Sequence, residues 1–189
     1  MKLKQLLRNV ILLITQPAMA WKFVSRMGNR AVMTSEFLYP MILLACLSTF
    51  LGIMLGSGFS GESLYPAIVR VVVMFFTFFC TYHLSSFLVS RLSLQYVGDE
   101  VDRTKTDLLT GYSMVVVLLL DLCLGLFPSF RIIGWIAQFY TVKIVWDGAA
   151  VLLRVPEERR LGYTMLVSLM IIFIPVVLGK GISLLSVNI

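Results

Sequence analysis

Apolar residues gather in five stretches that together occupy most of this 189-residue chain. Each stretch is at least as long as the ~20 residues that an α-helix needs to cross about 30 Å of hydrocarbon. Runs such as residues 71–76 are continuously apolar, whereas the strands of a membrane β-barrel alternate between apolar and polar residues. The pattern therefore predicts an all-α, polytopic membrane protein with five transmembrane helices. The expected spans are residues 37–57, 66–90, 108–129, 132–153 and 161–185.

The first 36 residues have a different, amphipathic pattern. Leucine, valine and isoleucine recur at helical spacing between residues 3 and 14, while Lys4 and Arg8 line the other face. This pattern predicts a helix that lies in the membrane interface and ends at Pro17. The alternative is a cleavable signal peptide, but its apolar core would be short and basic residues follow it. We expect an N-terminal cytoplasmic interfacial segment over residues 1–36 and a five-helix transmembrane domain over residues 37–189.

Basic residues are distributed unevenly between the expected connections. The N-terminal segment and the connections over residues 91–107 and 154–160 carry 12 of the 16 lysines and arginines, whereas the other side receives only Arg131 and Lys180. By the positive-inside rule, the N-terminus lies in the cytoplasm and the C-terminus lies outside. Topology and attraction to anionic lipid then explain the net charge of +6, which does not indicate nucleic-acid binding.

Catalytic and metal-binding patterns are absent from the sequence. Cys46, Cys80 and Cys123 fall inside expected spans without the close spacing of redox or metal sites. The chain has one histidine, and it has no phosphate-binding loop, zinc motif or nucleophile elbow. The sequence therefore predicts a protein that is not an enzyme and uses no cofactor or metal.

Ionisable residues inside the expected spans are the candidate functional residues, because an unpaired charge there costs several kcal/mol. Asp121 needs a cationic neighbour, and Arg70 is favoured because it can reach a similar depth in the membrane, with Lys143 as the alternative. Lys143 can also pair with Asp147, which lies four residues later on the same helix face. Two interpretations compete. Either the charges lock helices together, which we favour, or Asp121, Lys143, Asp147 and His83 form a polar track for protons, ions or a lipid headgroup. The candidates are Arg70, His83, Asp121, Lys143 and Asp147.

Small residues and short connections indicate how the helices pack. Gly52 and Gly56 form a Gly-x-x-x-Gly pair, for which we expect a contact inside the bundle rather than a dimer seam. The tight turn at residues 127–131 predicts an antiparallel hairpin of the third and fourth helices. Tyr112 and Tyr163 are expected at the cytoplasmic interface. Residues 91–107 are expected to form a solvated loop.

The entry to the third span reads Asp-Leu-Leu-Thr-Gly-Tyr-Ser at residues 107–113, which includes Gly111, Tyr112 and Ser113. Residues 16–21 read Gln-Pro-Ala-Met-Ala-Trp, and Tyr-Pro opens the first span. Together with five spans and a tight hairpin, these features resemble the Yip family of Rab-interacting membrane proteins and its prokaryotic relatives over most of the chain. The chain lacks the long acidic cytoplasmic region of the eukaryotic members, which favours a bacterial protein of the cell (inner) membrane.

These observations predict a non-catalytic integral membrane protein that organises the membrane or docks a partner through its cytoplasmic face. The alternative is a small transporter, or a component that handles lipid or ions along the polar track. The expected partners are the lipid bilayer and a protein whose identity the sequence does not give, with a second copy of the chain as one option.

Overall fold

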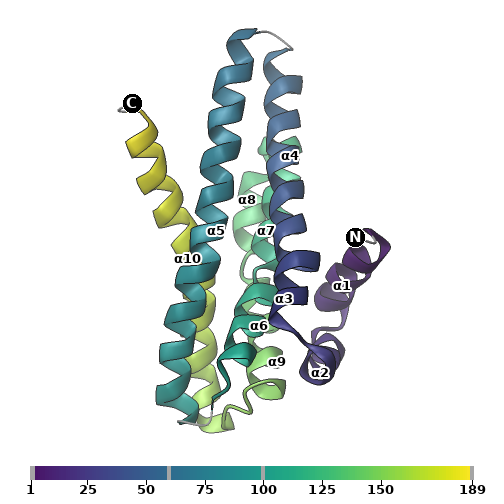
Figure 1. Ribbon diagram of the computed structural model, residues 1–189, viewed down its shortest axis with the longest axis vertical. Helices are drawn as coiled ribbons and strands as arrows, with labels where there is room; N and C mark the ends of the chain where they lie inside the picture. Colours follow the sequence, from purple (N-terminus) through teal and green to yellow (C-terminus); the bar gives the residue numbers. More distant parts are fainter. Residues whose placement is uncertain (1–2, 59–60, 99–100, 188–189) are drawn as a thin grey trace.

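The computed structural model describes residues 3–58, 61–98 and 101–187, and within these residues the chain is helical apart from short connections. The long helices form an elongated bundle, and the N-terminal helices stand at its side (Figure 1). The expected all-α fold is confirmed. In chain order the helices are α1 (Leu3–Thr15), α2 (Pro17–Met27), α3 (Arg30–Met33), the π-helical turn η1 (Thr34–Leu38), α4 (Tyr39–Ser57), α5 (Gly61–Val97), α6 (Arg103–Ser113), α7 (Val115–Leu126), the 3-10 turn η2 (Pro128–Phe130), α8 (Arg131–Ala137), α9 (Tyr140–Val151) and α10 (Glu157–Val187).

Four helical stretches in the described residues are long and apolar enough to cross a membrane, by length and composition. They correspond to the first, second, third and fifth expected spans, and all four begin earlier than expected. The chain is therefore a multi-pass integral membrane protein. The stretches are Arg30–Ser57, Glu62–Val97, Arg103–Leu126 and Glu157–Leu184.

The fourth apolar stretch differs from its prediction. Residues 132–153 form α8 and α9 with a turn between them, so four spanning helices are found in the described chain instead of five. At the turn, the amides of Thr141 and Val142 bond to carbonyls three residues back, each at 3.0 Å, in place of the α-helical ladder. Neither proline nor glycine stands at the break. The Phe-Tyr-Thr-Val run that follows consists of aromatic and β-branched residues, which are weak helix formers.

The first spanning stretch contains the π-helical turn η1, where the amide of Tyr39 bonds to the carbonyl of Thr34. Pro40 has no N–H, so the regular ladder is interrupted one residue later, and a wider turn accommodates the gap. The helix nevertheless continues from Arg30 to Ser57. The expected boundary between residues 36 and 37 falls inside this helix, and the division into two regions stays a prediction.

Helix α4 packs closely against α7 through small residues. A Cβ atom on Gly52 would lie 1.8 Å from the carbonyl oxygen of Gly125, so the two backbones are in contact there. The hydroxyl of Ser48, one turn earlier, donates to the carbonyl of Leu122. A Cβ atom on Gly56 would have no neighbour within 4 Å. The expected contact inside the bundle is therefore confirmed for Gly52, while Gly56 takes no part in it.

The connection between the second and third spans is much shorter than expected. Helix α5 continues to Val97, and α6 begins at Arg103 after Asp102 caps it by accepting a hydrogen bond from the amide of Thr104 at 2.8 Å. The prediction of a solvated loop over residues 91–107 is thus wrong for most of its length. Ser93 is fully buried, with its hydroxyl 2.9 Å from that of Tyr163 on α10, because the polar end of α5 packs against α10.

Helices α1 and α2 pack on the outside of the bundle (Figure 1). The predicted apolar face of α1 divides in two. Leu6, Val10 and Leu13 are buried against protein, whereas Leu7 and Ile11 are exposed. The helix predicted between residues 3 and 14 is confirmed, and one side of it is attached to the bundle.

Candidate functional site

The family-like tripeptide attaches the N-terminal segment to the third span. Gly111 lies against the side-chain end of Met33, and the Tyr112 ring contacts the rings of Trp21 and Phe37, with centroids 6.1 and 4.7 Å away. Ser113 is fully buried. The ring of Trp21 from the N-terminal segment and the ring of Phe37 from η1 cover Tyr112, so it does not face lipid as an aromatic-belt residue would, and its position at the cytoplasmic interface stays a prediction.

Trp21 is inserted into the bundle at this attachment. Its indole N–H donates to the carbonyl of Ile144 on α9 at 2.9 Å, and its side chain is fully buried. A Cβ atom on Gly148 would come within 2.8 Å of the indole ring, so the ring occupies space that the side chain of any other residue at position 148 would need. The hydroxyl of Tyr140 donates to the carbonyl of Ile14 at 2.6 Å, which fixes the end of α1 to the same part of the bundle.

An ion pair with a buried carboxylate lies beside this attachment. The guanidinium of Arg30 on α3 is 3.1 Å from a carboxylate oxygen of Asp107 on α6, and the other carboxylate oxygen accepts a hydrogen bond from Ser86 on α5. Asp107 is 1% exposed and Arg30 is 47% exposed, so the cation can reach water while the anion cannot. The pair joins the N-terminal segment to the second and third spans.

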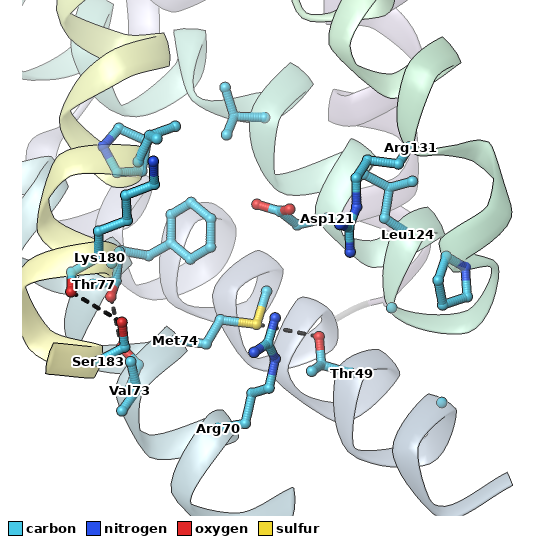
Figure 2. A pocket seen from close by; sticks show the side chains of 18 of the residues that line it. Thr49, Arg70, Val73, Met74, Thr77, Asp121, Leu124, Arg131, Lys180 and Ser183 are labelled. Carbon is cyan, nitrogen blue, oxygen red and sulfur yellow. Dashed lines mark hydrogen bonds between the residues drawn. The ribbon is translucent and has the colours of Figure 1, made fainter. Parts of the chain in front are cut away.

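A cavity of about 630 Å³ lies among α4, α5, α7, α8 and α10. Its volume is in the range of small-molecule sites in proteins. Asp121, Arg70 and Arg131 reach toward a common space from three different helices, as Figure 2 shows. Lys180 of α10 also lines the cavity. The carbonyl oxygen of the Gln138 side chain is buried without a hydrogen-bond partner, so the wall carries an unsatisfied acceptor.

The structure brings Asp121 and Arg70 to the same cavity, but it does not join them directly. The three ion pairs within 4.0 Å among the described residues are Arg30–Asp107, Lys143–Asp147 and Arg160–Glu157. Asp121 therefore faces three cations, Arg70, Arg131 and Lys180, across open space. Lys143, the alternative partner, is absent from the cavity wall.

The other candidates do not extend this site into a track. Lys143 and Asp147 on α9 pair at 2.9 Å, as their i,i+4 spacing predicts, and Lys143 is 54% exposed. His83 is exposed on α5, with its ring against those of Phe79 and Tyr82. A single track through Asp121, Lys143, Asp147 and His83 is therefore not formed.

Four residues that these sites use were not among the candidates predicted from the sequence. Arg30, Arg131 and Lys180 were counted only for topology, and Asp107 was assigned to a loop. A signal was present for Asp107, because it is the first residue of the family-like heptapeptide and directly precedes an apolar run. Arg131 and Lys180 lie 49 residues apart in the chain, so their convergence on one cavity depends on how the helices that carry them are arranged in the bundle.

The arrangement can hold a charged group or anchor a segment. Among the described residues, no group of three or more His, Cys, Asp or Glu side chains is placed to hold a metal ion. The fold and these sites define a multi-pass helical membrane protein with an attached N-terminal segment and a charged cavity.

Residues 11–179 match the Yip1 domain, and the chain belongs to the Yip family. The resemblance drawn from the entry to the third span is thereby confirmed. No curated protein and no solved structure matches the chain.

Proposed function

We propose that the protein organises the membrane, without catalysing a reaction, by inserting the side of α1 and α2 that faces away from the bundle into one leaflet. The observation that carries this proposal is the exposed surface of the two helices. Large apolar side chains there stand next to cations, a composition typical of helices that lie in the interface of an anionic membrane. The apolar residues are Leu7, Ile11, Met19, Phe23 and Met27, and the cations are Lys4, Arg8, Lys22 and Arg26.

The rigid attachment of these helices supports the proposal. Trp21, the bond from Tyr140 to Ile14 and the Arg30–Asp107 pair hold α1–α3 against the transmembrane helices. An amphipathic segment on a flexible tether can leave the leaflet without moving the bundle. A segment fixed at three points adds its volume to one leaflet wherever the bundle is inserted, which favours a curved membrane.

Leu7→Glu with Ile11→Glu is expected to abolish the effect of the protein on vesicle shape. The two side chains are 50% and 59% exposed, so the bundle loses little packing, whereas insertion loses about 1.5–3 kcal/mol for each apolar side chain. We would reconstitute the full chain into vesicles containing anionic lipid and measure their diameters by electron cryomicroscopy. The parent is expected to give narrower or tubular vesicles at the same protein-to-lipid ratio.

The matched control is Gln5→Glu with Gln16→Glu, which adds the same charge at exposed polar positions and should deform vesicles nearly as the parent does. Melting temperatures in detergent would establish that both double variants are folded. Vesicles of ordinary diameter with the parent, or equal deformation by the Leu7/Ile11 variant, would refute the proposal.

For the topology, we propose five crossings, with α8 and α9 together as a broken fourth one. In Figure 1, α10 begins at the end of the bundle where α5 ends and α6 begins, so the chain returns from α7 to that end through α8 and α9. This end also carries Arg103, Lys105, Arg154, Arg159 and Arg160. The positive-inside rule then places it in the cytoplasm, and a bacterial cell membrane is our proposed location.

The topology predicts opposite accessibility for two positions. In a background without the three native cysteines, Ser129→Cys should react with a membrane-impermeant maleimide in intact cells, whereas Glu158→Cys should react only after permeabilisation. A reporter fused after Ile189 should read as exocytoplasmic. Labelling of Glu158→Cys from outside would show that α8 and α9 do not cross.

A further inference from the structure

The cavity among α4, α5, α7, α8 and α10 has more positive charge than its own walls neutralise. The wall carries three positive charges, those of Arg70, Arg131 and Lys180, and one negative charge, that of Asp121. Within the described chain, none of the three cations forms an ion pair or a cation–π contact. The cavity therefore carries an excess of two positive charges, and its three cations are exposed, so an anion from outside the protein can reach them.

The identity of the cations indicates the class of anion. Two of them are guanidinium groups, whose planar donors match two oxygens of a phosphate at once, and the third is an ammonium group that acts as a point charge. Arg70 and Arg131 come from α5 and α8 and reach toward a common space in Figure 2. The hydroxyl groups of Thr49 and Thr77 add polar atoms to the same walls.

Helix α10 lines the cavity on both sides of an internal proline. Pro175 lies inside α10 and removes the hydrogen bond to the carbonyl four residues earlier, which bends a helix. Beyond this point α10 and α5 diverge in Figure 1, and the residues of α10 that line the cavity include Pro175, Gly179 and Lys180. On α8, Trp135 lines the cavity one turn after Arg131, and its ring is half exposed, so an acyl chain can lie against it.

We infer that this cavity is a binding site for a phosphate ester, held by Arg70, Arg131 and Lys180. Asp121 balances part of the positive charge when the site is empty and opposes the bound anion. The phosphate belongs either to a lipid headgroup that enters from the bilayer or to a soluble ester. This site is separate from the exposed surface of α1 and α2, so it stands whether or not that surface deforms membranes.

The test measures binding of phosphatidylglycerol to the full chain in a neutral detergent by native mass spectrometry, with diacylglycerol as the lipid that lacks phosphate. Arg70→Gln and Arg131→Gln should each weaken binding about tenfold or more, the loss expected for a charge-assisted hydrogen bond. Asp121→Asn should strengthen binding, because it removes a repulsive charge. Binding to the parent should weaken as salt rises.

Arg159→Gln is the matched control, because it removes one exposed cation that is not part of the cavity wall, and it should leave the affinity unchanged. If the glutamine variants do not fold, Lys180→Gln near the end of α10 and Asp121→Asn test the same site. If glycerol phosphate displaces phosphatidylglycerol at a concentration similar to that of the lipid, the ligand is a soluble ester. If glycerol phosphate does not displace the lipid, the ligand is a lipid headgroup. Equal affinity in all cavity variants, or equal loss with Arg159→Gln, would overturn the inference.

Discussion

Gly52→Ala is expected to separate α4 from α7 and to lower the free energy of unfolding by about 3 kcal/mol or more. The new methyl group would lie 1.8 Å from the carbonyl oxygen of Gly125, and this atom belongs to the backbone, so no side-chain rotation can relieve the clash. A whole helix has to move, and the hydrogen bond from Ser48 to Leu122 is lost with it. In a thermal melt of the detergent-solubilised protein, we expect a decrease of roughly 6–12 °C in the melting temperature.

Gly56→Ala is the control for this change, because it makes the same substitution one turn later in the same helix. Its methyl group meets no atom within 4 Å, and alanine is about 1 kcal/mol more favourable than glycine inside a helix. The melting temperature should therefore stay unchanged or rise slightly. If both variants melt like the parent, the close contact between α4 and α7 does not exist.

The pattern of apolar residues was sufficient to predict four of the spanning helices, because a helix in lipid must be apolar over its whole length. The break between α8 and α9 could not be predicted in the same way. The turn at Gln138 and Phe139 contains no helix-breaking residue, and the stretch around it is apolar enough for an unbroken span. The choice between one long helix and two short ones depends on what α9 packs against, which includes α2 and α10.

Tyr112 and Asp107 illustrate a second limit. A tyrosine at the start of a span is typical of the lipid interface, and an aspartate beside charged residues is typical of a loop. Both are buried here, because Trp21, Phe37 and Arg30 cover them from a segment that lies more than 65 positions earlier in the chain. The amphipathic pattern of residues 3–14 predicted the helix, but it contained no information about the surface to which that helix attaches.

Arg30→Ala is expected to destabilise the attachment of the N-terminal segment by roughly 3 kcal/mol, because it leaves the carboxylate of Asp107 buried with Ser86 as its remaining polar contact. The value lies at the lower end of the range for buried pairs, since Arg30 is half exposed and water screens part of its charge. The measurement is a detergent melt together with limited proteolysis, in which cleavage between α3 and the preceding helices should become faster.

The Arg30–Asp107 pair makes a further prediction that a simple loss of packing would not produce. Adding Asp107→Asn to Arg30→Ala should restore part of the stability, because a neutral amide tolerates burial better than an unpaired carboxylate. Lys143→Ala is the control, since it breaks an i,i+4 pair whose carboxylate is 12% exposed, against 1% for Asp107, and i,i+4 pairs contribute about 1 kcal/mol or less. A double variant that is less stable than Arg30→Ala alone, or a Lys143→Ala variant as unstable as Arg30→Ala, would show that the buried carboxylate is not the source of the effect.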